Sequence, residues 1–138
     1  MKALVIDGST TIGFLLKDKQ SVSALKALDA IENGTPTFVP AHWFVEVANG
    51  LIMAERRKRA SQADITEALG LAASLPVIAD ELTAQNVGSS TAALARQYSL
   101  TIYDAAYLEL AMRRGASLAT TDRALAKAAK AAGVVITP

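Results

Sequence analysis

The sequence of 138 residues contains no cysteine and only one histidine. This excludes disulfide bonds, thiolate zinc sites and cysteine nucleophiles, and it is typical of a reducing compartment. Any metal ion must therefore be bound by oxygen atoms or by that one histidine. Aromatic residues make up 5% of the chain although 51% of it is hydrophobic, so we expect a core of small aliphatic side chains between packed helices.

Long apolar runs and a strong net charge are also missing. No stretch approaches the roughly eighteen apolar residues of a membrane span, and Asp7 interrupts the apolar N-terminal segment where a signal peptide would continue. We therefore expect a cytoplasmic protein that does not contact a membrane. The 14 basic and 13 acidic residues nearly cancel, so total charge neither supports nor excludes a nucleic-acid partner. The length predicts one domain, residues 1–138.

Short apolar runs alternate with amphipathic segments along the chain. A short apolar run that ends at a turn indicates a buried strand, whereas apolar residues at every third or fourth position indicate a helix. The predicted strands are 3–6, 37–39, 77–79, 117–120 and 134–136, with a tight Asp-Gly-Ser turn after the first. The predicted helices are 22–31, 41–59, 61–76, 82–98, 102–114 and 122–132. This alternation predicts an α/β fold with a mostly parallel central sheet of about four to five short strands flanked by helices.

Four carboxylates stand beside apolar residues, where burial would be costly without a compensating charge or metal ion. Asp7 and Asp122 each follow a predicted strand, Asp104 opens an apolar helix, and Glu46 lies about two turns into another. Ligand sites in parallel sheets gather at the carboxyl ends of the strands, so we expect the four to meet at that edge. Oxygen donors of this kind suit Mg²⁺ or Mn²⁺, which support phosphodiester hydrolysis.

Simpler explanations remain open for three of these acids. Asp7 and Asp122 could each cap the N-terminus of a helix, where aspartate is favoured. Asp104 could complement a helix dipole from the first turn. For Glu46 we find neither a cap nor a nearby base that would explain an acid within an apolar helix.

A basic cluster, residues 56–59, ends the helix that carries Glu46. It either faces solvent at the negative end of the helix dipole or contacts an RNA backbone. If it contacts RNA, the arginines that we expect to share in binding are Arg56, Arg57, Arg113, Arg114 and Arg123.

Three segments, VIDGST, VEVANGL and LTIYDAAYLELAMRRGASLATTDRAL, together resemble the PIN-domain nucleases, and among them the VapC-like toxins of bacterial toxin–antitoxin pairs. The resemblance spans nearly the whole chain and implies a PIN-like fold. It implies that Asp7 and Asp104 bind the metal directly, that Glu46 completes the cluster and that Asp122 acts mainly through water. Supporting contacts would come from Ser9, Asn49 and Thr120.

The chain departs from the family pattern at two positions. Gly8 stands where a small residue with a Cβ is more usual, and His42 has no family role that we can assign.

The resemblance implies a Mg²⁺-dependent endoribonuclease toxin that leaves 5′-phosphates and is silenced by a VapB-like antitoxin. We also expect a homodimer, because a second subunit would help a small domain to hold a long substrate. Two alternatives are a non-catalytic PIN-like module that only binds a partner and an aspartate-dependent phosphatase. The presence of all four acids argues against the first, and Ser9, where a phosphatase would usually carry a second acid, argues against the second.

Overall fold

The computed structural model describes residues 3–137, and its centre is a parallel four-stranded sheet. The strands are β1 (Leu4–Ile6), β2 (Thr37–Val39), β3 (Ile78–Ala79) and β4 (Ser117–Ala119), in the order β3-β2-β1-β4. All three residues of β1 are fully buried, as expected for a strand in a parallel sheet that is covered on both faces. The predicted α/β architecture is confirmed.

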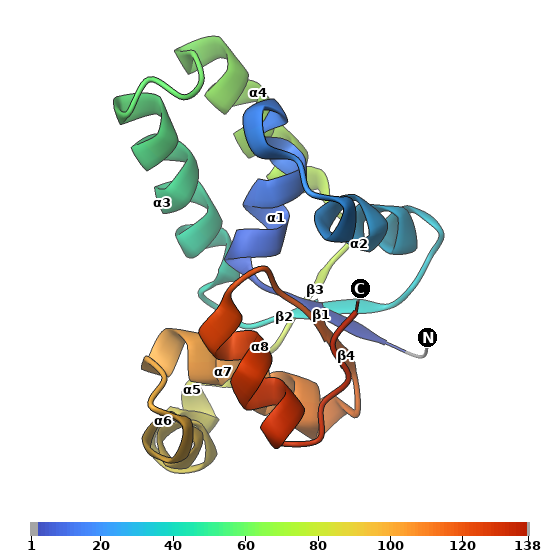
Figure 1. Cartoon of the computed structure of the whole chain (residues 1–138), viewed down its shortest axis with the longest axis vertical. Helices are drawn as coiled ribbons and strands as arrows, with labels where there is room; N and C mark the ends of the chain where they lie inside the picture. Colours follow the sequence, from blue (N-terminus) through green and yellow to red (C-terminus); the bar gives the residue numbers. More distant parts are fainter. Residues whose placement is uncertain (1–2, 138) are drawn as a thin grey trace.

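Helices cover both faces of the sheet. Figure 1 shows α1 (Gly8–Leu15), α2 (Val22–Glu32), α3 (Trp43–Arg56) and α4 (Gln62–Ser74) on one side, with a short 3₁₀ turn at Lys17–Lys19. On the other side lie α5 (Thr83–Asn86), α6 (Ala92–Tyr98), α7 (Ile102–Arg114) and α8 (Arg123–Ala131). The chain thus leaves β1 toward one face and leaves the neighbouring β4 toward the other. Open α/β sheets bind their ligands at such a switch point, outside the carboxyl ends of the strands.

The predicted tight turn after β1 is wrong, because α1 begins there. Asp7 is the N-cap of this helix, and its side chain accepts a hydrogen bond from the backbone N–H of Thr10. Gly8 and the β-branched Thr10 and Thr11 have weak helix propensities, which conceal the helix in the sequence. Thr10, Thr11 and Phe14 are buried, so tertiary packing outweighs the local preference.

Most of the other predicted helices are confirmed, with changes at their ends. Ser21 and Ser61 cap α2 and α4 by accepting backbone hydrogen bonds, and Gly115 ends α7 in the left-handed conformation. α3 begins at Trp43 and ends at Arg56, so it is shorter at both ends than the predicted 41–59.

Two predicted segments are interrupted. The single helix expected at 82–98 consists of α5 and α6, joined by a π-helical turn at Val87–Thr91 that includes Gly88. The strand expected at 134–136 forms only one isolated bridge, between Ile136 and Leu118. The sheet therefore has four strands and one additional bridge beside β4.

Small aliphatic side chains fill the core on both sides of the sheet, as the composition predicted. The indole N–H of Trp43 is satisfied inside this core by the hydroxyl of Thr11, at 3.0 Å, which ties α3 to α1. Among residues 3–137, no helix is both long and apolar enough to cross a membrane.

Candidate functional site

Asp7 lies at the carboxyl end of β1 with only 4% of its surface exposed. Its carboxylate accepts hydrogen bonds from the Ser9 hydroxyl at 2.8 and 2.9 Å, from the Thr10 backbone N–H at 2.9 Å and from the Thr120 hydroxyl. Burial raises the pKa of Asp7, although these bonds lower it in part. The carboxylate is thus held in a fixed orientation by neutral donors, and its negative charge is only partly compensated.

Hydroxyl groups connect Asp7 to the start of α8. Thr120 donates to Asp7 and accepts a hydrogen bond from the backbone N–H of Asp122 at 3.0 Å. Asp122 is the N-cap of α8 and accepts from the backbone N–H of Ala124 at 2.9 Å. Asp7 and Asp122 therefore both cap helices, and both lie at the carboxyl edge of the sheet. The helix-cap role and the shared-site role that the sequence suggested are thus compatible.

Glu46 lies in the first turn of α3 rather than two turns into the helix, because α3 begins at Trp43. Its Oε1 atom accepts a hydrogen bond from the Tyr107 hydroxyl at 2.8 Å and lies 3.0 Å from Nε2 of His42. Burial raises the pKa of Glu46, but the bonds from His42 and Tyr107 outweigh it and lower the pKa overall. His42 is the nearby base that the sequence analysis did not find, although its spacing of four residues from Glu46 is one that brings side chains together on a helix.

Asp104 lies in the first turn of α7 and is partly buried. Its backbone N–H is capped by the Thr101 hydroxyl at 3.1 Å. Burial, followed by the negative charges of the other three acids, raises the pKa of Asp104 to about 6. The carboxylates that contribute to this shift are Asp122, Glu46 and Asp7. Four acids from separate segments thus share one electrostatic field, which we call the acidic cluster.

A divalent cation is compatible with the chemistry of the acidic cluster. Within residues 3–137, no three Asp, Glu or His side chains stand as a ready-made metal-binding group. Mg²⁺, however, commonly uses only one or two carboxylates and keeps several waters. Asp7 and Asp104 both have raised pKa values, which a bound cation would reverse by favouring the ionised forms. These two are the residues that would hold the ion.

The predicted supporting residues differ in their contacts. Ser9 and Thr120 both hydrogen-bond to Asp7, and Ser9 also accepts from the backbone N–H of Thr121 at 3.1 Å. Asn49 is exposed on α3, one turn beyond Glu46, and we find no hydrogen bond from its side chain among residues 3–137.

Arg113 has an internal role that the sequence analysis missed. Its guanidinium binds both carboxylate oxygens of Asp80, at 2.9 and 2.8 Å, and both oxygens of Glu109, at 2.8 Å each. Asp80 and Glu109 are 5% and 6% exposed, and the bonds from Arg113 hold the pKa of Asp80 at about 2. Arg113 therefore joins α7 to the segment after β3. The spacing of Glu109 and Arg113, four residues apart on one helix, is the pattern that indicates this pair.

The other predicted RNA-binding arginines are exposed but not equally placed. Arg114 lies over the ring of Phe38, 4.4 Å from its centroid, in a cation–π contact. Arg56 and Arg57 lie at the far end of α3, roughly 15 Å along the helix axis from Glu46 at 1.5 Å per residue. Arg123 opens α8 directly after Asp122, next to the acidic cluster.

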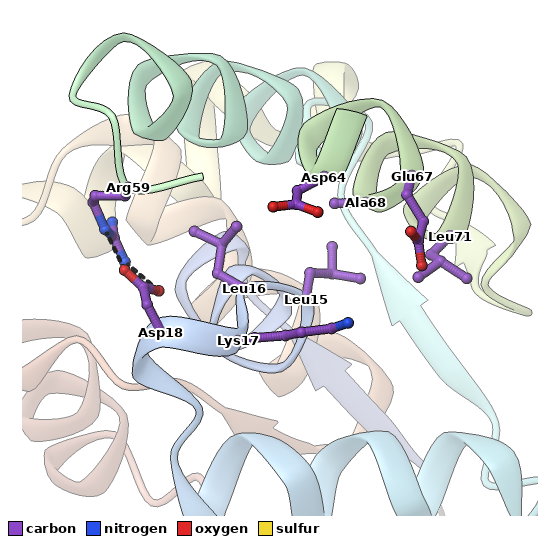
Figure 2. Close-up of a pocket in the computed structure, with 9 residues that line it drawn as sticks. All are labelled: Leu15, Leu16, Lys17, Asp18, Arg59, Asp64, Glu67, Ala68 and Leu71. Carbon is purple, nitrogen blue, oxygen red and sulfur yellow. Dashed lines mark hydrogen bonds and ion pairs between the residues drawn. The ribbon is translucent and has the colours of Figure 1, made fainter. Parts of the chain in front are cut away.

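A hollow between the end of α1 and α4 is separate from the acidic cluster, none of whose residues lines it (Figure 2). The bidentate ion pair of Arg59 with Asp18, at 3.0 and 3.2 Å, lies on its wall. The other lining residues are Leu15, Leu16, Lys17, Asp64, Glu67, Ala68 and Leu71. Because it lies away from the carboxyl ends of β1 and β4, we do not assign the phosphate chemistry to it.

Comparison with known proteins identifies the family. The chain matches the PIN domain over residues 4–131. It is 32% identical over 125 residues, which is 91% of this chain and 86% of the relative, to Ribonuclease VapC3 of Mycobacterium tuberculosis (strain CDC 1551 / Oshkosh). The chain belongs to the PIN-domain family, and within that family it is VapC-like.

Solved structures share the fold at low sequence identity. PAE2754 from Pyrobaculum aerophilum superposes with a TM-score of 0.70 at 21% identity, covering 97% of this chain and 88% of that one. VapBC2 from Rickettsia felis, bound to a DNA fragment from their promoter, gives 0.64 at 13% identity, covering 97% and 96%. FitAcB from Neisseria gonorrhoeae gives 0.55 at 16% identity, covering 98% and 96%. At these identities the structures support the PIN-like fold.

Proposed function

We propose that this chain is a Mg²⁺- or Mn²⁺-dependent endoribonuclease, and that it is the toxin of a VapBC-type toxin–antitoxin pair in the cytoplasm. The observation that carries the proposal is the raised pKa of Asp104, because it arises in part from three other carboxylates at the switch point of the sheet. Uncompensated negative charge at a ligand-binding edge is what a cation-dependent phosphodiester site requires. The relative named as a ribonuclease supports the choice of RNA as substrate.

The contacts of each acid in the acidic cluster suggest a separate role for it. Asp7, oriented by the Ser9 and Thr120 hydroxyls, and Asp104, which is only partly buried, would hold the ion. Glu46 is kept ionised by Tyr107 and His42, so it can accept a proton from an attacking water. Asp122 would act on a second water. When bound, Mg²⁺ neutralises phosphodiester charge and lowers the pKa of a coordinated water.

The direct test is incubation of the purified, partner-free chain with total RNA, with Mg²⁺ and with a chelator. We expect cleavage only with the metal, products that carry 5′-phosphates, and no cleavage by the Asp104→Asn variant purified in parallel. Metal-independent cleavage that persists in Asp104→Asn would point to a contaminating nuclease. A complete lack of cleavage by the folded parent would instead favour a module that only binds a partner.

The toxin assignment has its own test. A solved structure from Klebsiella pneumoniae that shares this fold, with a TM-score of 0.54, is named a toxin–antitoxin complex, which supports a neighbouring gene for a VapB-like antitoxin whose C-terminal tail covers the acidic cluster. Expression of this chain alone should slow growth, whereas Asp104→Asn expressed at the same level should not. Normal growth at full expression of the parent would contradict the toxin role.

We also propose that the chain forms a homodimer. Light scattering at roughly tens of micromolar should give twice the mass of the chain, and a monomer at that concentration would contradict the proposal.

A further inference from the structure

Tyr103 is an aromatic residue in an unusual position. It is 61% exposed, whereas Tyr107, Trp43 and Phe14 are each less than 5% exposed. It directly precedes Asp104 in the first turn of α7, and its ring contacts His42, whose Nε2 lies 3.0 Å from Oε1 of Glu46 in the acidic cluster. Its ring is not buried, and among residues 3–137 its aromatic contact is with His42.

His42 holds Tyr103 in place. The two ring centroids are 5.6 Å apart with the planes at 72°, and Nε2 of His42 lies 3.2 Å from the carbonyl oxygen of Tyr103. His42 is itself fixed by the buried ring of Tyr107, 5.4 Å away at 78°, and by Glu46. Such edge contacts orient the Tyr103 ring while most of its surface stays accessible. An exposed ring with a defined orientation is pre-organised for a flat ligand.

We propose that Tyr103, positioned by His42, is a stacking platform for an unpaired nucleobase beside the phosphodiester that is cut. The inference rests on the proposed ribonuclease function and adds to it a residue that would hold one base of the substrate. Every base has a face that can stack on an aromatic ring, but only an unpaired base can turn that face outward. His42 is a positioning residue in this arrangement, and Tyr103 is a binding residue.

The positions of the predicted RNA-binding arginines leave room for a contribution from base stacking. The acidic cluster repels an RNA backbone until a cation is bound. Arg113 is occupied by two internal carboxylates, and Arg56 and Arg57 lie roughly 15 Å from Glu46 along α3. Arg123 is the predicted RNA-binding arginine next to the cluster. Base stacking on Tyr103 would therefore add to the binding that phosphate contacts such as those of Arg123 supply.

The test is a double-mutant cycle between the protein and its substrate. A site of cleavage is mapped in total RNA, and oligonucleotides that span it are made with a single abasic ribose at each position in turn. The proteins are the parent, Tyr103→Leu, and Tyr103→Phe, which keeps the ring. A fourth protein, the variant Phe44→Leu, lacks another exposed aromatic ring, one that contacts Trp43.

Tyr103→Leu should raise KM by about 5- to 100-fold, the usual effect of one lost base stack, and leave kcat within about twofold. Tyr103→Phe should behave as the parent. One abasic position next to the cleaved bond should weaken binding of the parent and have no further effect on Tyr103→Leu. Phe44→Leu should retain that abasic effect in full.

Several results would overturn the inference while the ribonuclease function stands. Equal abasic effects in the parent and in Tyr103→Leu would show that no base stacks on this ring. A fall in kcat alone would make Tyr103 a support of Asp104. Loss of the dimer in Tyr103→Leu with unchanged KM would assign the ring to a protein interface. If the parent cuts no RNA at all, the proposed function fails first and the platform fails with it.

Discussion

The hydroxyl of Tyr107 on α7 donates a hydrogen bond of 2.8 Å to Oε1 of Glu46 on α3. Tyr107 is 1% exposed, so this bond reaches from the core to the acidic cluster. Burial raises the pKa of Glu46, and the bonds from His42 and Tyr107 lower it by more. The bond therefore favours the ionised carboxylate that can act as a base.

Replacement of Tyr107 by Phe should move the acid limb of the pH–rate profile to higher pH. Removal of the donor raises the pKa of Glu46, and activity that needs the ionised form is then lost at a higher pH as the solution is acidified. The free energy of unfolding should fall by about 1–3 kcal/mol, measured in urea at pH 7. Tyr98→Phe is the control, because its hydroxyl only accepts a surface bond from Gln97. A lower stability with an unmoved acid limb would mean that the bond serves only the fold.

Replacement of Arg113 by Met should destabilise the protein by about 3–5 kcal/mol, because it leaves the buried carboxylates of Asp80 and Glu109 without their partner. The pKa of Asp80 is held at about 2, below 3.8, so its ion pair contributes stability that is lost as the pH falls from about 4 to 2. That pH dependence should disappear in the variant. Arg114→Met, on the same helix, should cost about 1 kcal/mol or less for its cation–π contact.

Urea unfolding from pH 2 to 8 measures both variants. If Arg113→Met were as stable as Arg114→Met but bound RNA less tightly, the prediction would be contradicted. That result would support the expectation from the sequence that Arg113 contacts RNA.

The exposed arginines should differ in the salt dependence of RNA binding. Each phosphate contact on a single strand contributes a slope of about −0.7 to the plot of log affinity against log salt. Arg123→Gln, next to Asp122, should reduce the slope by about that amount, and Arg56→Gln/Arg57→Gln should reduce it only for RNA long enough to reach the end of α3. Titrations with a short and a long oligonucleotide measure this. An unchanged slope in all variants would make these arginines solvent-facing helix residues.

The strands and the carboxyl edge could be anticipated from the sequence because the apolar runs and the acids that follow them are local patterns. Apolar runs closed by Asp7 and by Asp122 define strands that end at the same edge, and Asp104 follows a recognisable cap. The helix α1 could not be predicted, since Gly8 and its threonines disfavour a helix unless the rest of the core is present to bury them.

Contacts between distant segments were the other part that the sequence did not predict. Asp80 and Arg113 are 33 residues apart, and nothing in either local segment indicates that a buried ion pair joins them. His42 and Tyr103 likewise meet only because α3 and α7 begin at the same edge of the sheet. Side-chain partners across elements depend on the packing of helices, which a single sequence does not specify.

Replacement of Asp104 by Asn should abolish cleavage and make the metal-free protein more stable than the parent. Asn keeps the shape of the side chain and removes one of four interacting negative charges. The pKa of Asp104 is about 6 in the folded chain and 3.8 in a free side chain. Its ionisation therefore opposes folding by about 1–3 kcal/mol at pH 7, after allowance for solvent screening, which corresponds to a few degrees in Tm.

The pH dependence separates this explanation from a simple helix-capping effect. Above pH 6, Asp104 is ionised in both the folded and the unfolded parent, and its charge then destabilises the folded chain to the full extent. The gain in free energy of unfolding from Asp104→Asn should therefore be largest there. As the pH falls from about 6 to 4, Asp104 is protonated in the folded parent before it is protonated in the unfolded parent. The difference in free energy of unfolding between Asp104→Asn and the parent should therefore fall to zero. Mg²⁺ should raise the Tm of the parent by mass action and raise that of Asp104→Asn less, because a direct ligand is gone. Calorimetry across this range, with and without Mg²⁺, measures all three effects. If Asp104→Asn instead melts several degrees lower at every pH and still cuts RNA, Asp104 only caps α7, and the four carboxylates do not form one site.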